Sequence, residues 1–194
     1  MKYDPDKHHR RSMRLQGYDY SSSGAYFVTI CVQNRACLFG QVKDNEMHLN
    51  NAGRMVQRAW EQLPQRFPTL GLDEYVVMPN HFHAIVVLAE APAVAPLVGA
   101  TMRSASRQGA EGPLTLGDMV GAFKSITTVE YTRGVRQSGW AAFESRLWQR
   151  NYWERIIRDE LALLRIREYI QTNPARWAAD QLHPKAVPNR CNEE

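Results

Sequence analysis

The chain has 194 residues, of which 44% are hydrophobic and 23% are charged, and it carries a formal net charge of +4. These values fit one globular domain with a hydrophobic core, which we expect to span residues 1–194, and they exclude fibrous and generally disordered proteins. The apolar runs are too short to cross a bilayer and the N-terminus lacks the apolar core of a signal peptide, so we expect a cytoplasmic protein without a membrane partner.

Basic residues are concentrated near both ends of the chain. A basic N-terminal arm at about residues 1–20 contains Arg10, Arg11 and Arg14, and further arginines are interleaved with aromatic residues between positions 146 and 167. Arginine suits bidentate contacts with phosphate, and aromatic rings suit stacking on bases. Solvated helix faces explain the charge equally well, so charge alone leaves a nucleic-acid partner as one of two interpretations.

The first half of the chain predicts a strand, a helix and a hairpin. Residues 25–33 are rich in β-branched and aromatic side chains and predict a strand. Residues 50–66 carry apolar side chains at helical spacing and predict an amphipathic helix. Residues 75–78 and 81–88 predict two antiparallel strands, joined by a tight turn at Pro79-Asn80.

A flexible loop and a helix are expected next. Residues 91–113 contain Pro, Gly, Ala and Ser without a sustained period, which is typical of a flexible insertion. Thr115 and Asp118 match a capping box at the start of a helix. We expect this helix to run to about Arg133 and to end at Gly134.

A stretch of mixed character at residues 140–153 precedes the last helix. That helix is expected to begin near Asp159 and to end by Asn173, because Pro174 disfavours helical geometry in the residue before it. The order of strands and helices predicts an α+β protein, in which helices cover one face of an antiparallel sheet.

The predicted hairpin carries two histidines at the start of its second strand. Side chains alternate between the two faces of a strand, so His81 and His83 point the same way while Phe82 points the opposite way. Two imidazoles on one face can bind a divalent metal together. A His-x-His pair by itself is a weak signal, and its meaning depends on further ligands elsewhere in the chain.

The last helix offers two polar side chains on one flank. Tyr169 and Asn173 are four residues apart and therefore lie together beside the apolar stripe of that helix. They can present a nucleophilic hydroxyl and an amide ligand, or they can be a half-buried aromatic and an ordinary helix-terminal residue. Tyr152 is the alternative nucleophile, although its aromatic and arginine neighbours equally suit base stacking or burial.

Four segments of the chain resemble the REP-associated tyrosine transposases, a branch of the single-tyrosine HUH transposases. The segments are RRSMRLQGYDYSSSGAYFVTICVQNRACLFG, DEYVVMPNHFHAIVVL, TLGDMVGAFKSITT and LWQRNYWERIIRDELALLRIREYIQTNPARW, which leave residues 91–113 outside the match. His81-Phe82-His83 matches the family's His-hydrophobic-His motif, and the EYIxxNP pattern contains Tyr169 and Asn173. The resemblance implies a ferredoxin-like α+β fold, a catalytic Tyr169, and His81, His83 and Asn173 as metal ligands.

The resemblance also implies the reaction and its substrate. With Mg²⁺ or Mn²⁺ bound, the Tyr169 hydroxyl would attack a phosphate of single-stranded DNA beside a palindromic hairpin, leaving a 5′-phosphotyrosine link and a free 3′-hydroxyl. Such a protein would be associated with the nucleoid, as a monomer or a homodimer. Candidate phosphate contacts are Arg10, Arg11, Arg14, Arg54, Arg58, Lys124 and Arg150.

Two other functions fit the same residues. A domesticated protein that keeps the fold for hairpin recognition but cuts little DNA would bind DNA without metal and form no covalent adduct. A metal hydrolase that uses water as its nucleophile would cut without a covalent intermediate. The transposase hypothesis predicts, in addition, that the sheet face carrying His81 and His83 lies against the helix of Tyr169.

Overall fold

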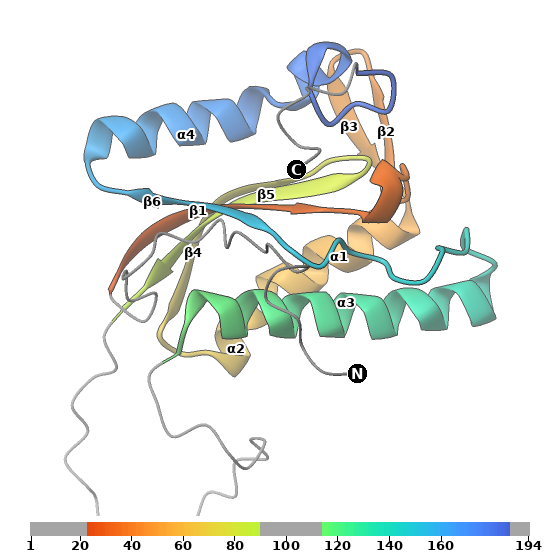
Figure 1. Cartoon of the computed structure of the whole chain (residues 1–194), viewed down its shortest axis with the longest axis horizontal. Helices are drawn as coiled ribbons and strands as arrows, with labels where there is room; N and C mark the ends of the chain where they lie inside the picture. The colour runs from red at the N-terminus through yellow and green to blue at the C-terminus, as the bar shows by residue number, and fades with distance from the viewer. Residues whose placement is uncertain (1–22, 90–113, 187–194) are drawn as a thin grey trace, which may run out of the picture.

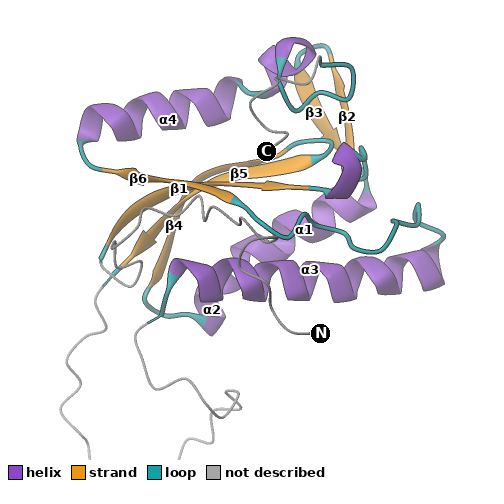
Figure 2. Ribbon diagram, viewed as in Figure 1, coloured by secondary structure: helices purple, strands orange, loops and turns teal. Residues whose placement is uncertain are grey.

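The structure, a computed structural model, describes residues 23–89 and 114–186 as a sheet with helices on both faces (Figure 1). Figure 2 shows the same arrangement by type of element. The strands are β1 (Gly24–Cys31), β2 (Gly40–Lys43), β3 (Glu46–Leu49), β4 (Leu70–Val77), β5 (His81–Leu88) and β6 (Trp153–Ile157). The helices are α1 (Asn51–Glu61), α2 (Leu63–Arg66), α3 (Leu116–Ser138) and α4 (Glu160–Thr172), with short 3-10 helices η1 (Gln33–Arg35) and η2 (Pro174–Ala179).

The main sheet has four antiparallel strands in the order β4-β5-β1-β6. β5 is therefore an interior strand, and the predicted pairing of the strands at residues 75–78 and 81–88 is confirmed. In the observed register, His83 lies opposite Thr29 on one side and Val76 on the other, and Thr29 lies opposite Trp153. These four residues form one row across the sheet.

The larger hydrophobic core lies between the sheet and the layer of α1 and α3. Val28 and Ile30 of β1 point into this core, where they pack with apolar residues of both helices. The Phe82 ring lies 4.7 Å from that of Trp60 and 5.1 Å from that of Phe123, measured between centroids. Phe82 thus points away from the histidine face, as strand alternation predicts.

A smaller core lies on the opposite face, under α4. Phe27 of β1 and Ile85 of β5 pack there with Ile166 and Ile170 of α4. The prediction that helices cover only one face is therefore wrong, since α4 lies across the sheet from α1 and α3 (Figure 1). Because β1 and β5 are apolar on both faces, each face needs a covering layer. The α+β class with an antiparallel sheet is confirmed.

Two strand features were absent from the sequence prediction. β2 and β3 form a separate hairpin that turns at Asp44 and Asn45, both with positive φ (50° and 65°). Asp and Asn tolerate this left-handed geometry better than other residues with side chains. β6 begins at Trp153, at the end of the mixed stretch, and pairs with β1 as an edge strand.

Two predicted helix boundaries differ from those observed. The helix expected over residues 50–66 divides into α1 and α2, because Pro64 cannot supply the backbone N–H that a continuing helix needs. Helix α3 continues through Gly134 to Ser138 and ends at Gly139, which has the left-handed φ of 64°. Gly134 fits inside the helix for a packing reason, since a Cβ there would lie 2.3 Å from Cε3 of Trp140.

Two predicted segments lie outside the described residues: the basic arm at about residues 1–20 and the loop at residues 91–113. None of the helices within residues 23–89 and 114–186 combines the length and the hydropathy that a membrane span requires.

Replacing Gly134 with alanine should destabilise the protein. The added methyl group would overlap the Trp140 ring, and overpacking of this kind costs about 1–3 kcal/mol. Gly121→Ala is the matched control on the same helix, because a Cβ there meets nothing within 4 Å. Alanine favours helix over glycine by about 1 kcal/mol, so Gly121→Ala should be neutral or stabilising. Urea unfolding measures both variants, and equal stability for Gly134→Ala and wild type would contradict the packing account.

Candidate metal and tyrosine site

Helix α4 lies over the part of β5 that carries the two histidines. The Tyr169 hydroxyl oxygen is 3.4 Å from Nε2 of His83, and the centroids of the two rings are 5.3 Å apart. The rings of His81 and His83 are 4.6 Å apart. The expected contact between the histidine face and the tyrosine helix is therefore present.

Asn80 sets the orientation of His81. Its amide nitrogen donates to the backbone oxygens of Arg35 (3.0 Å) and Leu182 (2.7 Å), so its Oδ1 acts as the acceptor for Nδ1 of His81 at 2.8 Å. His81 therefore carries its proton on Nδ1 and keeps a lone pair on Nε2. That Nε2 atom is buried and has no hydrogen-bond partner within the protein. This is the form in which an imidazole coordinates a metal.

Thr29 positions His83 from the neighbouring strand. Its hydroxyl oxygen lies 2.8 Å from Nδ1 of His83, because the register places the two residues opposite each other on β1 and β5. With Nδ1 engaged in this contact, Nε2 is the nitrogen that faces the Tyr169 hydroxyl. Both histidines are thus held through Nδ1, and both direct Nε2 toward the candidate site.

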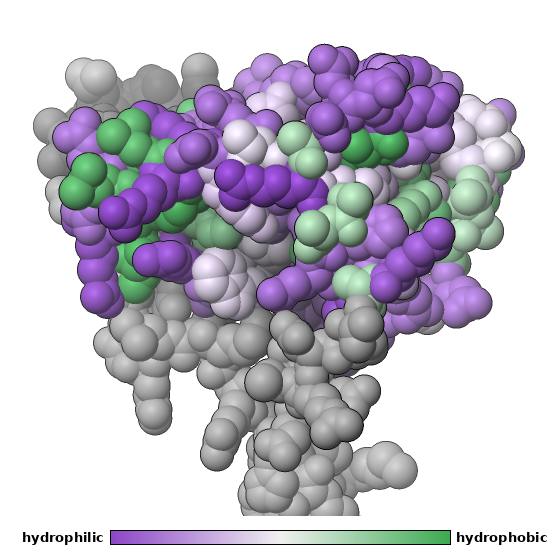
Figure 3. Space-filling view, turned by 90° about the horizontal axis from the view of Figure 1, so that it is seen from above, coloured by the Kyte–Doolittle hydropathy of each residue, from purple (hydrophilic) through white to green (hydrophobic). Residues whose placement is uncertain are grey.

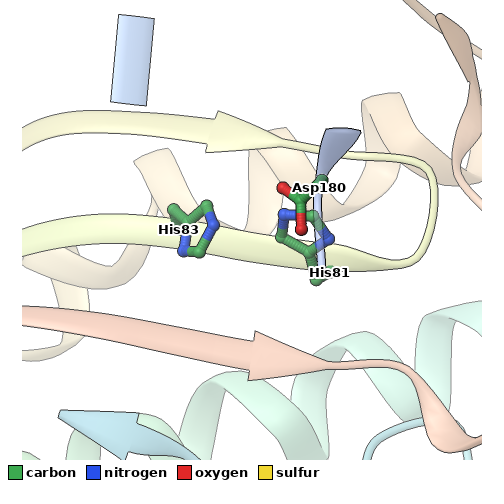
Figure 4. A group of neighbouring side chains, drawn as sticks. All are labelled: His81, His83 and Asp180. Carbon is green, nitrogen blue, oxygen red and sulfur yellow. The ribbon is translucent and has the colours of Figure 1, made fainter. Parts of the chain in front are cut away.

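Asp180, which the sequence reasoning missed, joins the two histidines. One ligand atom from each of the three residues lies within 4.8 Å of the other two. Figure 4 shows the Asp180 carboxylate beside the His81 ring. The backbone N–H of Leu182 donates to Oδ1 of Asp180 at 2.7 Å, which helps to fix the carboxylate.

The segment that carries this carboxylate is held against the β4–β5 turn. It follows η2, where the chain turns back after α4. Arg35 donates to the backbone oxygen of Gln181 at 3.1 Å, and the Trp177 ring lies 5.8 Å from that of His81. Together with the Asn80 contact, which spans 102 positions, and the Arg35 contact, which spans 146, these interactions join segments far apart in the sequence. No local pattern in the sequence signals such a contact, and this is why Asp180 was missed.

Asn173 lies at the end of α4, facing the same site. Its side chain is 1% exposed, and its Oδ1 atom has no hydrogen-bond partner within the protein. The amide is close enough to raise the pKa of His81 and to lower that of Tyr169. A buried oxygen without a partner is costly, and a bound cation would satisfy it.

Burial keeps both imidazoles neutral. It lowers the pKa of His81 to about 4, although the Asp180 carboxylate and the Asn173 amide act against this shift. Burial also lowers the pKa of His83 well below its ordinary value, and the neighbouring His81 adds to the effect. Burial, followed by the negative charge of Asp180, raises the pKa of Tyr169. The candidate site therefore holds two neutral imidazoles and a protonated phenol.

The residues around this site fit a divalent cation. His81 and His83 offer nitrogen ligands, while Asp180 and Asn173 offer oxygen ligands. Mixed nitrogen and oxygen donors are common around divalent transition metals, and the oxygens also suit Mg²⁺ and Mn²⁺. The two unpartnered buried atoms, Nε2 of His81 and Oδ1 of Asn173, support this fit.

Tyr152 and Lys124 do not approach the site. Tyr152 packs on the larger core, on the opposite side of the sheet from His83, and the Lys124 amine lies 5.4 Å from the centroid of its ring. The same amine donates to the backbone oxygens of residues 149–151 at 2.9 to 3.2 Å. Burial lowers the pKa of Lys124 to about 8. In this structure Lys124 therefore binds its own backbone, which leaves it poorly placed to bind a phosphate.

The other predicted phosphate contacts are scattered. Arg54 and Arg58 lie on α1, across the sheet from the site, and Arg54 donates to a backbone oxygen and a side chain near the start of that helix. Arg150 is exposed and lines a groove beside α3. The remaining three, Arg10, Arg11 and Arg14, lie outside the described residues.

Comparisons with known proteins identify a relative by sequence and a solved structure with a similar fold. No model of a known protein family matches the chain. A protein of Haemophilus influenzae (strain ATCC 51907 / DSM 11121 / KW20 / Rd), itself uncharacterized, is 41% identical over 185 residues, which cover 94% of this chain and 97% of that protein. Among solved structures, a REP-associated tyrosine transposase bound to a REP hairpin matches with a TM-score of 0.53 at 19% identity, covering 86% of this chain and 74% of that one. The chain therefore shares the fold of that structure, and the predicted α+β class with an antiparallel sheet is confirmed.

Replacing Asn80 with alanine should weaken metal binding about 10- to 100-fold, the usual effect of losing a group that orients a histidine ligand. Without the amide, Nδ1 of His81 loses its acceptor, and the segment carrying Asp180 loses an anchor. Calorimetric titration with Mn²⁺ measures the change, and Asn151→Ala on the exposed surface is the control. Wild-type affinity in a folded Asn80→Ala variant would contradict this role.

Proposed function

The chain belongs to the same family as the Haemophilus influenzae protein, and we propose that it is a metal-dependent DNA endonuclease and strand transferase with Tyr169 as nucleophile. The observation that carries the proposal is the 3.4 Å approach of the Tyr169 hydroxyl to Nε2 of His83, beside a group that can hold a metal. Similarity of fold to a tyrosine transposase supports it.

The proposed ligands are His81, His83, Asp180 and Asn173. A divalent cation bound there would neutralise the negative charge that develops on the oxygens of a scissile phosphate. Asn80 and Thr29 hold the imidazoles with Nε2 directed inward, so the ligand set is formed before substrate arrives.

Tyr169 would carry out the chemical step. Its oxygen forms a bond to phosphorus while the bond from phosphorus to the 3′-oxygen breaks, which yields a 5′-phosphotyrosine and a free 3′-hydroxyl. The phenol loses its proton and the leaving 3′-oxygen gains one. Phenol is a weak nucleophile while protonated, and burial makes this worse by raising the pKa of Tyr169. Positive charge placed beside the hydroxyl would counter that effect.

The substrate we propose is single-stranded DNA that adjoins a hairpin. The solved structure of similar fold was bound to a REP hairpin, and this chain has an excess of basic residues. We further propose that residues 1–194 act as one domain in the cytoplasm, as a monomer or homodimer, with Mg²⁺ or Mn²⁺ as the metal.

Tyr169→Phe should abolish the covalent protein–DNA adduct while it preserves the fold and metal binding. The assay incubates the protein with a labelled hairpin oligonucleotide that has single-stranded flanks, in Mn²⁺ or Mg²⁺, and detects the adduct by denaturing electrophoresis. Tyr152→Phe is the matched control and should retain the adduct, because Tyr152 lies across the sheet from the histidines.

Other outcomes of that assay identify other functions. An adduct that persists in Tyr169→Phe but disappears in Tyr152→Phe would show that the nucleophile is Tyr152. Cleavage without any adduct would indicate a hydrolase that uses water. Hairpin binding that survives a chelator, with no cleavage under either metal, would favour a domesticated DNA-binding protein.

Asp180→Asn should lower the affinity for Mn²⁺ by about tenfold or more, since it replaces an anionic ligand by a neutral one. Asn173→Ala should lower it as well, because it removes the buried oxygen that has no partner. Glu130→Gln is the control, since Glu130 is a partly exposed carboxylate on α3, across the sheet from the histidines, and pairs with Arg133 of the same helix. A loss of affinity confined to Asn173→Ala would exclude Asp180 from the ligand set.

A further inference from the structure

We propose that the exposed edge strand β6 presents Trp153 as a stacking platform for a base of single-stranded DNA, beside the phosphate that Tyr169 attacks. This inference rests on the proposed function, since it names how the same site would hold its substrate. It concerns binding, however, and can be tested without cleavage.

Trp153 lies on the same face of the sheet as the catalytic candidates. It occupies one row with Thr29 and His83, and Phe27 connects it to the tyrosine. The centroid of the Phe27 ring is 5.6 Å from that of Trp153 and 6.0 Å from that of Tyr169. Both rings contact the same phenylalanine. A base stacked on Trp153 would therefore be separated by about one or two nucleotides along the strand from the phosphate at the Tyr169 hydroxyl.

The exposure of the Trp153 indole is large for an aromatic side chain and calls for a functional explanation. Trp153 is 43% exposed, while Trp60, Trp148 and Trp177 are buried. Its ring makes an edge contact with Phe27, at an interplanar angle of 74°. A large aromatic surface on an edge strand is an aggregation hazard unless it binds something. Stacking on bases uses such a surface regardless of sequence.

The charges around Trp153 favour a polyanion as the occupant. Arg155 is two residues further along β6, on the same face, and Arg165 lies one helical turn before Tyr169 on the same flank of α4. Both are exposed, and neither has an ion-pair partner among the described residues. Figure 3 shows the α4 side of the molecule, where hydrophilic residues border the hydrophobic ones. Alternating guanidinium groups and an aromatic ring match the phosphates and bases of a single strand.

Fluorescence anisotropy of a labelled thymidine oligonucleotide tests the platform. The measurement uses the full chain in the Tyr169→Phe background with a chelator, so that no cutting occurs. Trp153→Ala should weaken binding about 5- to 150-fold, which is the range that loss of one base–aromatic stack produces. Trp153→Phe should recover most of the affinity, and an abasic site at the stacked position should weaken the Trp153→Phe variant but not Trp153→Ala.

Leu161→Ala is the control, because Leu161 is an exposed apolar residue of α4 outside the proposed platform. It should bind the oligonucleotide as the parent does. Unchanged DNA affinity of Trp153→Ala would overturn the proposal. It would also be overturned if Trp153→Ala lost as much affinity for a hairpin without a single-stranded flank as it loses for the single strand. A change in sedimentation without a change in DNA affinity would overturn it too, in favour of a contact between protein chains.

The two proposals can fail separately. If wild type forms no adduct with either metal but Trp153→Ala still loses single-strand binding, the proposed reaction is wrong and the platform stands. If the adduct forms and Trp153→Ala binds normally, the reaction stands and the platform is wrong.

Discussion

The pairing of β5 with a strand on each side is the constraint on which the candidate site depends. An interior strand has one register, and that register decides which face each side chain occupies. His81 and His83 therefore point toward α4, while Phe82 between them is fixed in the larger core. A slip of one residue would exchange these faces, burying both imidazoles among apolar side chains. The core on one face thus maintains the geometry of the site on the other.

The site concentrates polar groups in a place where burial makes them costly. His81, His83 and Asn173 are nearly inaccessible, and only part of their hydrogen-bonding capacity is used. Asn80 and Thr29 each contact Nδ1 of one imidazole, while Nε2 of His81 has no partner and Nε2 of His83 faces the Tyr169 hydroxyl at 3.4 Å. This arrangement does not favour the stability of the fold, because burying apolar residues of similar volume would carry a smaller free-energy cost. It is well explained by a ligand that completes the missing contacts.

The two sides of the site differ in what covers them. Toward the β4–β5 turn, Trp177 of η2 and Asp180, which directly follows η2, lie close against His81. Toward β6, the partly exposed rings of Tyr169 and Trp153 share Phe27 as a neighbour. The side of the candidate site toward β6 is therefore the side that is open to solvent.

Sequence alone determined the features that follow from local periodicity. Strand alternation put His81 and His83 on one face, and helical spacing put Tyr169 and Asn173 on one flank, so the placement of these four side chains within their elements could be predicted. Only the tertiary structure decided that Asp180 lies beside the two histidines, which tautomer Asn80 sets on His81, and that Trp153 and Tyr169 share Phe27 as a neighbour. It also decided that α4 covers the face opposite α1 and α3. The physical reason is that these features arise from contacts between distant segments, which follow from chain topology and packing and leave no periodic signal in the sequence.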